Sequence, residues 1–336
     1  MIRIRLLGCP KPDWSDPRVE FNPAFSEQQC DGVLVWGGMH GEFLKYRGVR
    51  AWFHDEPRTN SMWLTPLSKT ALRHVQLHEF LHHSNPDPRY RFPCATHYRT
   101  PTIAHRPVRK DTAIAVVNNY GGRFWWVRDE VASMRQNGPG KVWLRRGIKL
   151  RNRFILHQAV ELFGDPGNWN FFRQWPWSKP GPPPNYRGAY PADWLSEKHI
   201  AMLAQYRIAV CLENASLPYY FTEKLVNAAR AGCVPIYHAH PTLLTTRLQG
   251  AFWVDPADYD FDPSATLAAA KKCNADDVRE QNWKWLRSDQ VRETEGFTIW
   301  SRVADYFIER LNGATPRPPK TNDATDISSL PRSNIE

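Results

Sequence analysis

Short apolar segments alternate with segments of helical pattern along most of the chain, and this alternation limits the possible folds more than any other feature. The apolar segments predict strands at residues 2–8, 32–38, 49–54, 112–119, 206–214, 233–239 and 251–255. Strands separated by helices form parallel sheets, because a parallel pair needs a crossover connection of about a dozen residues or more. The sequence therefore predicts an α/β fold with parallel sheets.

The length of 336 residues suits two such units, since a single hydrophobic core seldom grows beyond roughly 250 to 300 residues. A polar, proline-containing stretch at 99–111 separates the first three predicted strands from the others. We therefore predict a first domain at 1–107 and a second at 108–316. The polar, irregular residues 317–336 predict a disordered tail.

Three further segments have a recognisable pattern. Residues 178–188 are rich in proline, which lacks a backbone donor, and they predict a surface loop on the second domain. Residues 67–83 predict a helix in the first domain. Residues 296–313 predict another helix. By the boundary above this helix falls within the second domain, and whether it packs across both domains stays open.

Composition limits the cellular location and the kinds of binding partner to be expected. No window approaches the roughly 20 apolar residues of a membrane span, and the first residues lack a secretion signal, so we expect a cytoplasmic protein. The six cysteines are scattered without a C-x-x-C pair, which favours reduced thiols over disulfides or structural zinc. A net charge of +10 favours anionic partners such as nucleotide phosphates, and leaves a peripheral contact with the inner face of an anionic membrane open.

The segment 206–237 is the most informative part of the chain. It contains a predicted buried strand, a loop, a helix and a second strand, in that order. The first strand ends at the polar pair Glu213 and Asn214. Thr222 is a favourable N-cap for the helix, and Gly232 suits the position just after its end. The segment therefore predicts a β-α-β unit.

A helix N-terminus at the carboxyl edge of a parallel sheet offers backbone N–H groups to an anion, so this turn is a candidate phosphate site. Lys224 stands in the first turn, where its charge opposes the helix dipole unless an anion shares the site. A solvated lysine is the alternative interpretation. Glu223 suits the dipole without any function, although its carboxylate could also accept ribose or sugar hydroxyls. The residues alone thus predict a nucleotide site.

The order of residues here resembles the signature segment of the α-1,3/1,4-fucosyltransferases. Glu-Asn is followed, after a gap, by Thr-Glu-Lys and then by a helix that ends in Ala-Gly before a Val-Pro-Ile strand. By this resemblance Lys224 would contact the donor diphosphate. Asn214, Tyr220 and Glu223 would hydrogen-bond to the ribose and the sugar or pack against them.

Weaker matches extend the resemblance over most of the chain except the tail. Residues 116–131 are similar to a strand end of that family followed by an arginine that binds the diphosphate. Arg123 is the candidate arginine, and Arg128 is the alternative because the spacing is looser here. Arginine suits the task, since its planar guanidinium can bind two phosphate oxygens at once. Residues 160–164 resemble a family strand, and 186–188 its approach to the main motif.

In the first domain, residues 53–57 resemble the family's Glu-Ser-Pro segment at a strand end, and 87–93 resemble a later Arg-Tyr-x-x-Pro stretch. The resemblance then makes Glu56 the general base. An inverting transfer needs one carboxylate that takes the proton of the acceptor hydroxyl as it attacks the anomeric carbon. The adjacent Asp55 is the alternative base, and a surface acid in a turn before proline is the non-catalytic interpretation of both.

Two other function classes are compatible with part of the sequence. His78, Glu79 and His82 form an H-E-x-x-H pattern, which on the predicted helix 67–83 would place both histidines on one face as zinc ligands of a hydrolase. No third histidine follows at the expected spacing, so a polar helix face is favoured and no metal site is expected. The dispersed charges and the lack of a recognition motif argue against a nucleic-acid partner.

The resemblance implies the two-domain GT-B architecture of glycosyltransferases, with the acceptor bound by the first domain, the donor by the second, and the site in the cleft between them. It implies an inverting transfer of L-fucose from GDP-fucose to a glycan hydroxyl, with an α-1,3-type linkage; another nucleotide sugar is the alternative donor. A divalent metal is not expected to be essential, because Lys224 and the arginine can neutralise the diphosphate. Acceptor glycan and oligomeric state are not readable from the sequence.

Overall fold

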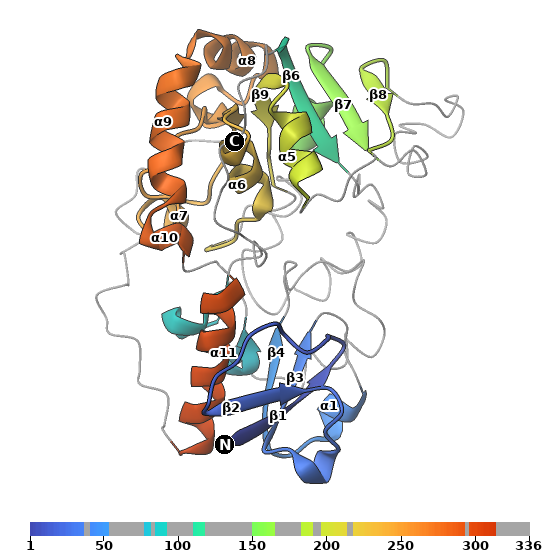
Figure 1. The fold of residues 1–336 in the computed structure, drawn as a ribbon. Coiled ribbons are helices and arrows are strands. Elements are labelled where there is room, and N and C mark those ends of the chain that lie inside the picture. Colours follow the sequence, from blue (N-terminus) through green and yellow to red (C-terminus); the bar gives the residue numbers. More distant parts are fainter. Residues whose placement is uncertain are drawn as a thin grey trace.

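A computed structural model describes residues 1–36, 41–53, 77–81, 85–92, 110–117, 150–164, 183–190, 196–213, 218–292 and 296–313. Within these ranges the chain forms two five-stranded sheets, each accompanied by its own helices (Figure 1). The strand pairs inside both sheets are parallel. The predicted α/β class with two Rossmann-like sheets is therefore confirmed.

The first sheet has the strand order β2-β1-β3-β4-β5. Its strands are β1 (Ile2–Leu7), β2 (Val19–Asn22), β3 (Gly32–Trp36), β4 (Val49–Phe53) and β5 (Phe80–Leu81). The short helices of this part of the chain are η1 (Glu27–Gln29), α1 (Gly41–Lys45), η3 (Leu77–Glu79) and η4 (Pro88–Tyr90). The chain moves outward from β1 to β2 and returns to β3 on the other side, so the strand order reverses between β1 and β3.

The second sheet has the order β10-β9-β6-β7-β8. Its strands are β6 (Lys110–Val117), β7 (Val160–Gly164), β8 (Tyr186–Gly188), β9 (Tyr206–Val210) and β10 (Val234–Ile236). Its helices are α5 (Glu197–Leu203), α6 (Glu223–Arg230), α7 (Pro241–Leu244), η7 (Pro256–Tyr259), α8 (Pro263–Lys272), α9 (Ala275–Leu286) and α10 (Asp289–Arg292). This is the strand order of dinucleotide-binding folds, and its reversal lies between β6 and β9.

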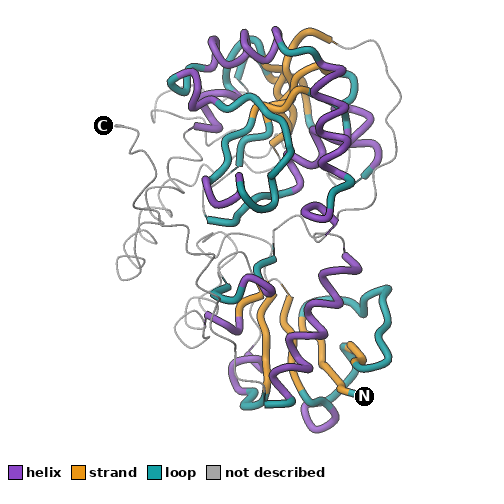
Figure 2. The backbone as a smooth tube through the Cα atoms, turned by 90° about the vertical axis from the view of Figure 1, so that its left-hand side faces the viewer, coloured by secondary structure: helices purple, strands orange, loops and turns teal. Residues whose placement is uncertain are grey.

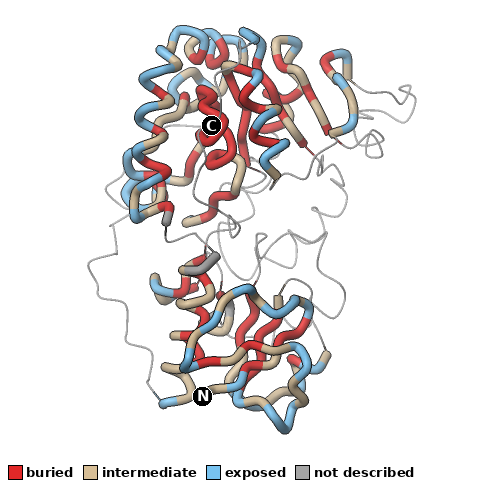
Figure 3. Tube along the Cα trace, in the orientation of Figure 1, coloured by how far each residue is buried: buried red, intermediate tan, exposed pale blue. Residues whose placement is uncertain are grey.

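Helices cover both faces of the second sheet (Figure 2). One face packs against a cluster that includes residues of α5, α6 and α9, and the other against a cluster that includes residues of α8. Ile208 of β9 and Ile114 of β6 are fully buried, which suits central strands covered on both sides. The burial map shows the same pattern, with buried strands inside and exposed outer helix faces (Figure 3).

The last helix, α11 (Gly296–Leu311), packs against the first sheet and not the second. Its residues Ile299, Val303 and Phe307 lie in one hydrophobic cluster with Ile4 of β1. The sequence-based bounds 108–316 include this helix and left its packing across both domains open; the described contacts lie with the first sheet. The amphipathic pattern of the helix required an apolar surface but did not specify which sheet supplies it. The boundary predicted within 99–111 and the tail 317–336 lie outside the described residues, except for the start of β6.

The predicted helix 67–83 is also wrong where the structure describes it. Residues 77–79 form the 3₁₀ helix η3, and Phe80 and Leu81 form β5, paired with Trp52 and Phe53 of β4. Leu81 is fully buried. Pairing of Leu81 with the edge of the sheet goes with its burial, which an exposed helix at this place would not provide. The helical face required by the H-E-x-x-H zinc pattern is therefore absent, and His82 lies outside the described residues.

Two predictions about irregular segments need correction. Tyr186–Gly188, predicted within a loop, forms the strand β8. The Tyr186 N–H donates to the Pro183 carbonyl at 2.9 Å, which closes a turn just before this strand. β8 is an edge strand, and an edge strand needs a partner on one side only. The strand predicted at 251–255 is reduced to one bridge between Val254 and Ile236. The strands β2 and β5 were not predicted from the sequence.

In the described part of the chain, no helix combines the length and apolar character that crossing a membrane requires. Five cysteines are described there, and all five carry free thiols: Cys9, Cys30, Cys211, Cys233 and Cys273.

Candidate functional site

The candidate site lies at the carboxyl end of β9, beside the point where the strand order of the second sheet reverses. β9 pairs with β6 on one side and with β10 on the other. In open α/β sheets, ligands bind outside the carboxyl ends of the strands at such a reversal. The loop that leaves β9 leads to the N-terminus of α6, so the predicted β-α-β unit is confirmed.

Local chemistry explains where α6 begins and ends. Thr222 has extended backbone angles, and its side chain accepts a hydrogen bond from the Lys224 N–H, which is the geometry of an N-cap. At the other end, Gly232 has a φ of 65°, a left-handed conformation that suits glycine after a helix. The apolar residues Leu225 and Ala228 are fully buried against the sheet. Both predicted caps are thus confirmed.

A buried carboxylate organises the turn between β9 and α6. The Glu213 side chain is only 3% exposed. Its Oε1 accepts from the Thr222 N–H at 2.7 Å and from the Tyr237 hydroxyl at 3.0 Å. The Thr222 hydroxyl lies 3.0 and 2.9 Å from the two carboxylate oxygens. Buried charges are stable only when paired and hydrogen-bonded, and Glu213 meets both conditions once Lys224 is included.

The ammonium group of Lys224 completes this arrangement. Its Nζ lies 3.3 Å from Glu213 Oε2 and 3.0 Å from the Thr222 hydroxyl oxygen, and the side chain remains 24% exposed. A cation in the first turn opposes the helix dipole, and the sequence therefore suggested a neighbouring anion. The structure supplies that anion within the protein, as the carboxylate of Glu213. A lysine held in this way has a fixed position at the helix N-terminus.

A second carboxylate stands beside the lysine. Glu223 Oε1 lies 3.8 Å from Lys224 Nζ, and the Glu223 side chain is 17% exposed. Burial raises the pKa of this carboxyl above its ordinary value; Lys224 lowers it and Glu213 raises it further. Burial also raises the pKa of the Tyr237 hydroxyl well above its ordinary value, so Tyr237 stays protonated and donates to Glu213.

Tyr220 precedes the N-cap and is buried, with 2% of its surface exposed. Of the predicted site residues, Glu223 and Lys224 therefore lie together in the first turn of α6, and Tyr220 lies two residues before its N-cap. The other predicted site residues lie outside the described residues: Glu56 with its alternative Asp55, Arg123 with its alternative Arg128, and Asn214.

Two groups near this edge were missed by the sequence reasoning. Glu213 was read as a strand end, although a charged residue directly after a buried strand was a usable signal. His238, just beyond β10, has its Nδ1 2.8 Å from Asp255 Oδ1, and the ring packs edge-on against Phe261. A carboxylate that holds one ring nitrogen fixes the orientation of a histidine. The sequence offered no signal for that pair, because the two residues lie 17 positions apart with α7 between them.

The arrangement can bind an anion and accept hydroxyl hydrogen bonds. Lys224 supplies a charge-assisted donor with a fixed position, and the N-terminal turn of α6 adds its dipole. The carboxyl of Glu223 is an acceptor of the kind that binds paired hydroxyls. Together these groups suit a ligand that joins phosphate to sugar.

No known protein-family model matches the chain, and no curated protein matches it in sequence. Solved structures similar to it include an α1,3-fucosyltransferase, at 12% identity and a TM-score of 0.41, covering 94% of this chain and 91% of that one. They include AviGT4, a glycosyltransferase of avilamycin A biosynthesis, at 14% identity and 0.40, covering 92% and 84%. An α-glucosyltransferase in complex with UDP and DNA has 10% identity and 0.43, covering 86% and 85%. Likenesses at this level identify no family for the chain.

Proposed function

We propose that the chain is an inverting glycosyltransferase of the GT-B type, which binds a nucleoside diphosphate sugar at the N-terminus of α6. One observation carries this proposal. The sequence segment that resembles the fucosyltransferase signature folds into a turn where Lys224, Thr222 and Glu213 contact one another at the carboxyl edge of the sheet. The donor proposed from the resemblance is GDP-fucose.

Lys224 would contact the diphosphate, while Glu213 and Thr222 keep its ammonium group in place. Glu223 would accept hydroxyls of the ribose or the sugar. β6 pairs in parallel with β9 and ends at Val117 on the same carboxyl edge, and Arg123 follows six residues later in the sequence. An arginine from there would add a second cation for the two phosphates.

The chemical step is a single displacement. The acceptor oxygen forms a bond to the anomeric carbon from the face opposite the nucleotide, and the bond from that carbon to the phosphate oxygen breaks. The electron pair leaves with GDP, and the carboxylate of Glu56, or of Asp55, takes the proton of the acceptor hydroxyl. Glu56 follows β4 by three residues, at the carboxyl end of a strand of the first sheet.

Nucleotide binding tests the proposal first. GDP should raise the melting temperature of the protein, and UDP should raise it less. A similar rise with both nucleotides would contradict the assignment of GDP-fucose as donor, and no rise with either would contradict the proposed nucleotide site. Hydrolysis of a panel of sugar nucleotides then identifies the donor.

Lys224→Ala tests the position of the diphosphate. The loss of a charge-assisted hydrogen bond to phosphate should weaken GDP binding about ten- to a hundredfold, measured by calorimetry. Lys271→Ala is the matched control, because Lys271 is an exposed lysine in the last turn of α8. Equal GDP affinity of the two variants would place the diphosphate elsewhere.

The acceptor side of the proposal rests on the resemblance alone. We propose a glycan acceptor. A cytoplasmic location is a prediction from composition, and a peripheral contact with an anionic membrane or a lipid-linked glycan is a further prediction. Binding of the protein to anionic vesicles, compared with neutral ones, would test the membrane contact.

A further inference from the structure

Tyr219, three residues before the N-cap of α6, has an unusual backbone conformation. Its φ is 58°, in the left-handed region that few residues other than glycine adopt. A bulky residue remains in such a conformation only where its surroundings hold it, and such residues are frequent at ligand sites. The residues that follow Tyr219 lead directly into the candidate site at the N-terminus of α6.

The backbone of Tyr219 is held from α7. The Tyr219 N–H donates to the Thr242 hydroxyl oxygen at 2.8 Å, and that hydroxyl lies 3.0 Å from His240 Nδ1. The Thr242 N–H also points to His240 Nδ1, at 3.3 Å, so this nitrogen is an acceptor and the Thr242 hydroxyl donates to it. Burial lowers the pKa of His240 to about 4, with His238 contributing, which keeps the ring neutral as this arrangement requires.

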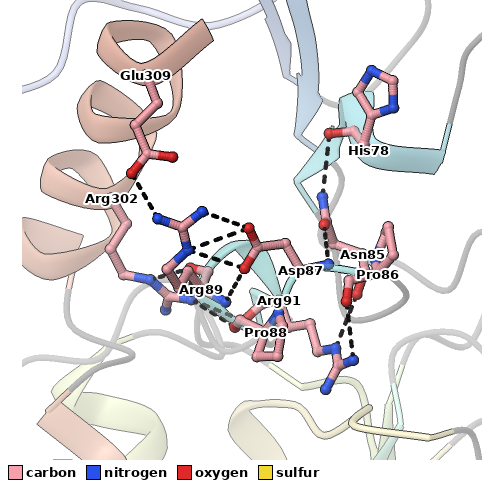
Figure 4. A network of polar contacts seen from close by, with 9 residues as sticks. All are labelled: His78, Asn85, Pro86, Asp87, Pro88, Arg89, Arg91, Arg302 and Glu309. Carbon is pink, nitrogen blue, oxygen red and sulfur yellow. Dashed lines mark hydrogen bonds and ion pairs between the residues drawn. The ribbon is translucent and has the colours of Figure 1, made fainter. Parts of the chain in front are cut away.

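The ring of Tyr219 is held from the other half of the chain. The guanidinium carbon of Arg91 lies 4.2 Å from the ring centroid, which is a close cation–π contact. Arg91 is oriented by two backbone carbonyls: its Nε donates to Asn85 O at 2.9 Å and its Nη2 to Pro86 O at 3.3 Å (Figure 4).

The segment that carries Arg91 is itself fastened to α11. Arg302 of α11 donates from Nε to the Arg89 carbonyl at 2.7 Å and packs its guanidinium 4.4 Å from the centre of the Phe92 ring. Arg89 pairs with Glu309 of α11 at 2.6 Å (Figure 4). Arg91 thus projects from a segment that several polar contacts fix to α11.

We propose that Arg91 is a positioning residue for the nucleotide site: it holds Tyr219 in its left-handed conformation, and through Tyr219 it sets the loop that leads into Thr222 and Lys224. This inference rests on the proposed function for the identity of the ligand. Arg91 would then influence donor binding without touching the donor. It can do so because the cation–π contact joins Arg91, in the half of the chain that forms the first sheet, to Tyr219 in the other half.

Amide hydrogen exchange of the whole protein without nucleotide tests the positioning directly. Arg91→Ala should speed exchange in residues 218–224 about 2- to 30-fold, the range expected for loss of one cation–π contact. GDP affinity should fall by a similar factor. Arg91→Lys should give a smaller effect, because a lysine cannot stack its planar group on the ring. Tyr219→Phe should behave as the wild type, because it keeps the ring.

Arg287→Ala is the matched control. It also removes an arginine that packs on an aromatic ring, but that ring is Trp283 of α9, with the guanidinium carbon 6.0 Å from the ring centroid. This variant should leave exchange in 218–224 unchanged. Wild-type exchange in Arg91→Ala, or equal acceleration in Arg287→Ala, would overturn the inference. If Arg91→Ala speeds exchange and lowers GDP affinity, the inference holds. If the wild type binds no nucleotide, the proposed function fails. In that case the exchange data alone decide whether Arg91 holds the loop.

Discussion

Replacing Glu213 by glutamine tests the central contact of the candidate site. The amide keeps the shape of the side chain and can still accept from the Thr222 N–H and the Tyr237 hydroxyl, which lie 2.7 and 3.0 Å from Oε1. The other carboxylate oxygen becomes an NH₂ group, which cannot accept from the ammonium of Lys224, 3.3 Å away. The variant therefore loses one charge-assisted bond and leaves a lysine without its carboxylate.

The magnitude follows from the exposure of the two partners. Breaking a fully buried ion pair costs about 3 to 5 kcal/mol, whereas a hydrogen bond to a charged group contributes about 1.5 to 3 kcal/mol. Because Lys224 is 24% exposed and solvent can screen its charge, the lower range applies. For domains of this size each kcal/mol shifts the melting temperature by roughly 2 to 4 °C, so Glu213→Gln should lower it by roughly 3 to 12 °C.

Thermal unfolding followed by tryptophan fluorescence measures this shift. Glu280→Gln is the control, because Glu280 pairs with Lys284 at 2.7 Å in a setting where both side chains are mostly exposed, and such a pair contributes little. A double-mutant cycle with Lys224→Met should show coupling between Glu213 and Lys224. If Glu213→Gln melts within about 1 °C of the wild type, or if the cycle shows no coupling, the carboxylate does not hold the lysine.

Three further predictions concern charge and chemistry. The pKa of Glu223 is raised in the folded protein, mainly by burial. The stability linked to the proton of Glu223 is therefore fully present below the pKa that this carboxyl has in the unfolded chain. It is lost as pH rises through the raised pKa of the folded protein. Glu223→Gln should therefore gain stability over the wild type as pH rises through the raised pKa of Glu223, and a difference in urea unfolding that stays constant with pH would contradict this. Glu56→Gln should lower turnover by roughly two to four orders of magnitude with GDP affinity intact; normal turnover in Glu56→Gln but not in Asp55→Asn would move the base to Asp55. Transfer should persist in chelator, since Lys224 supplies positive charge at the diphosphate, and complete loss would show that a divalent metal is essential.

The features predicted correctly at this site are those decided by neighbouring residues. The caps of α6 depend on the hydroxyl of Thr222 and on the left-handed conformation available to Gly232, and both can be recognised within a few residues of sequence. The strand β9 was predictable because Ile208, Ala209 and Val210 are consecutive apolar residues, which supply both faces of the strand. The roles assigned to Arg123 and Glu56 stay predictions.

The features that were missed or wrong depend on contacts between distant segments. The Tyr237 hydroxyl reaches Glu213 across 24 positions of sequence, and Arg91 reaches Tyr219 from the other half of the chain. The strand β5 has two residues, too few to show a period, and only the free edge of β4 makes it a strand. Such pairings cannot be read from local propensity, because tertiary context overrides it.

The position of α11 has a consequence for how the protein is made. A Cβ at Gly32 would lie 2.9 Å from the ring of Phe307, so β3 is shaped to receive a helix that emerges from the ribosome much later. At a synthesis rate of about 5 to 20 residues per second, the interval of about 240 residues between β4 and α11 lasts roughly 10 to 50 s. During that time one apolar face of the nascent sheet lacks its cover, which makes it a target for chaperones. A released chain truncated before Gly296 should therefore keep the helices that cover its second sheet while its first sheet lacks α11.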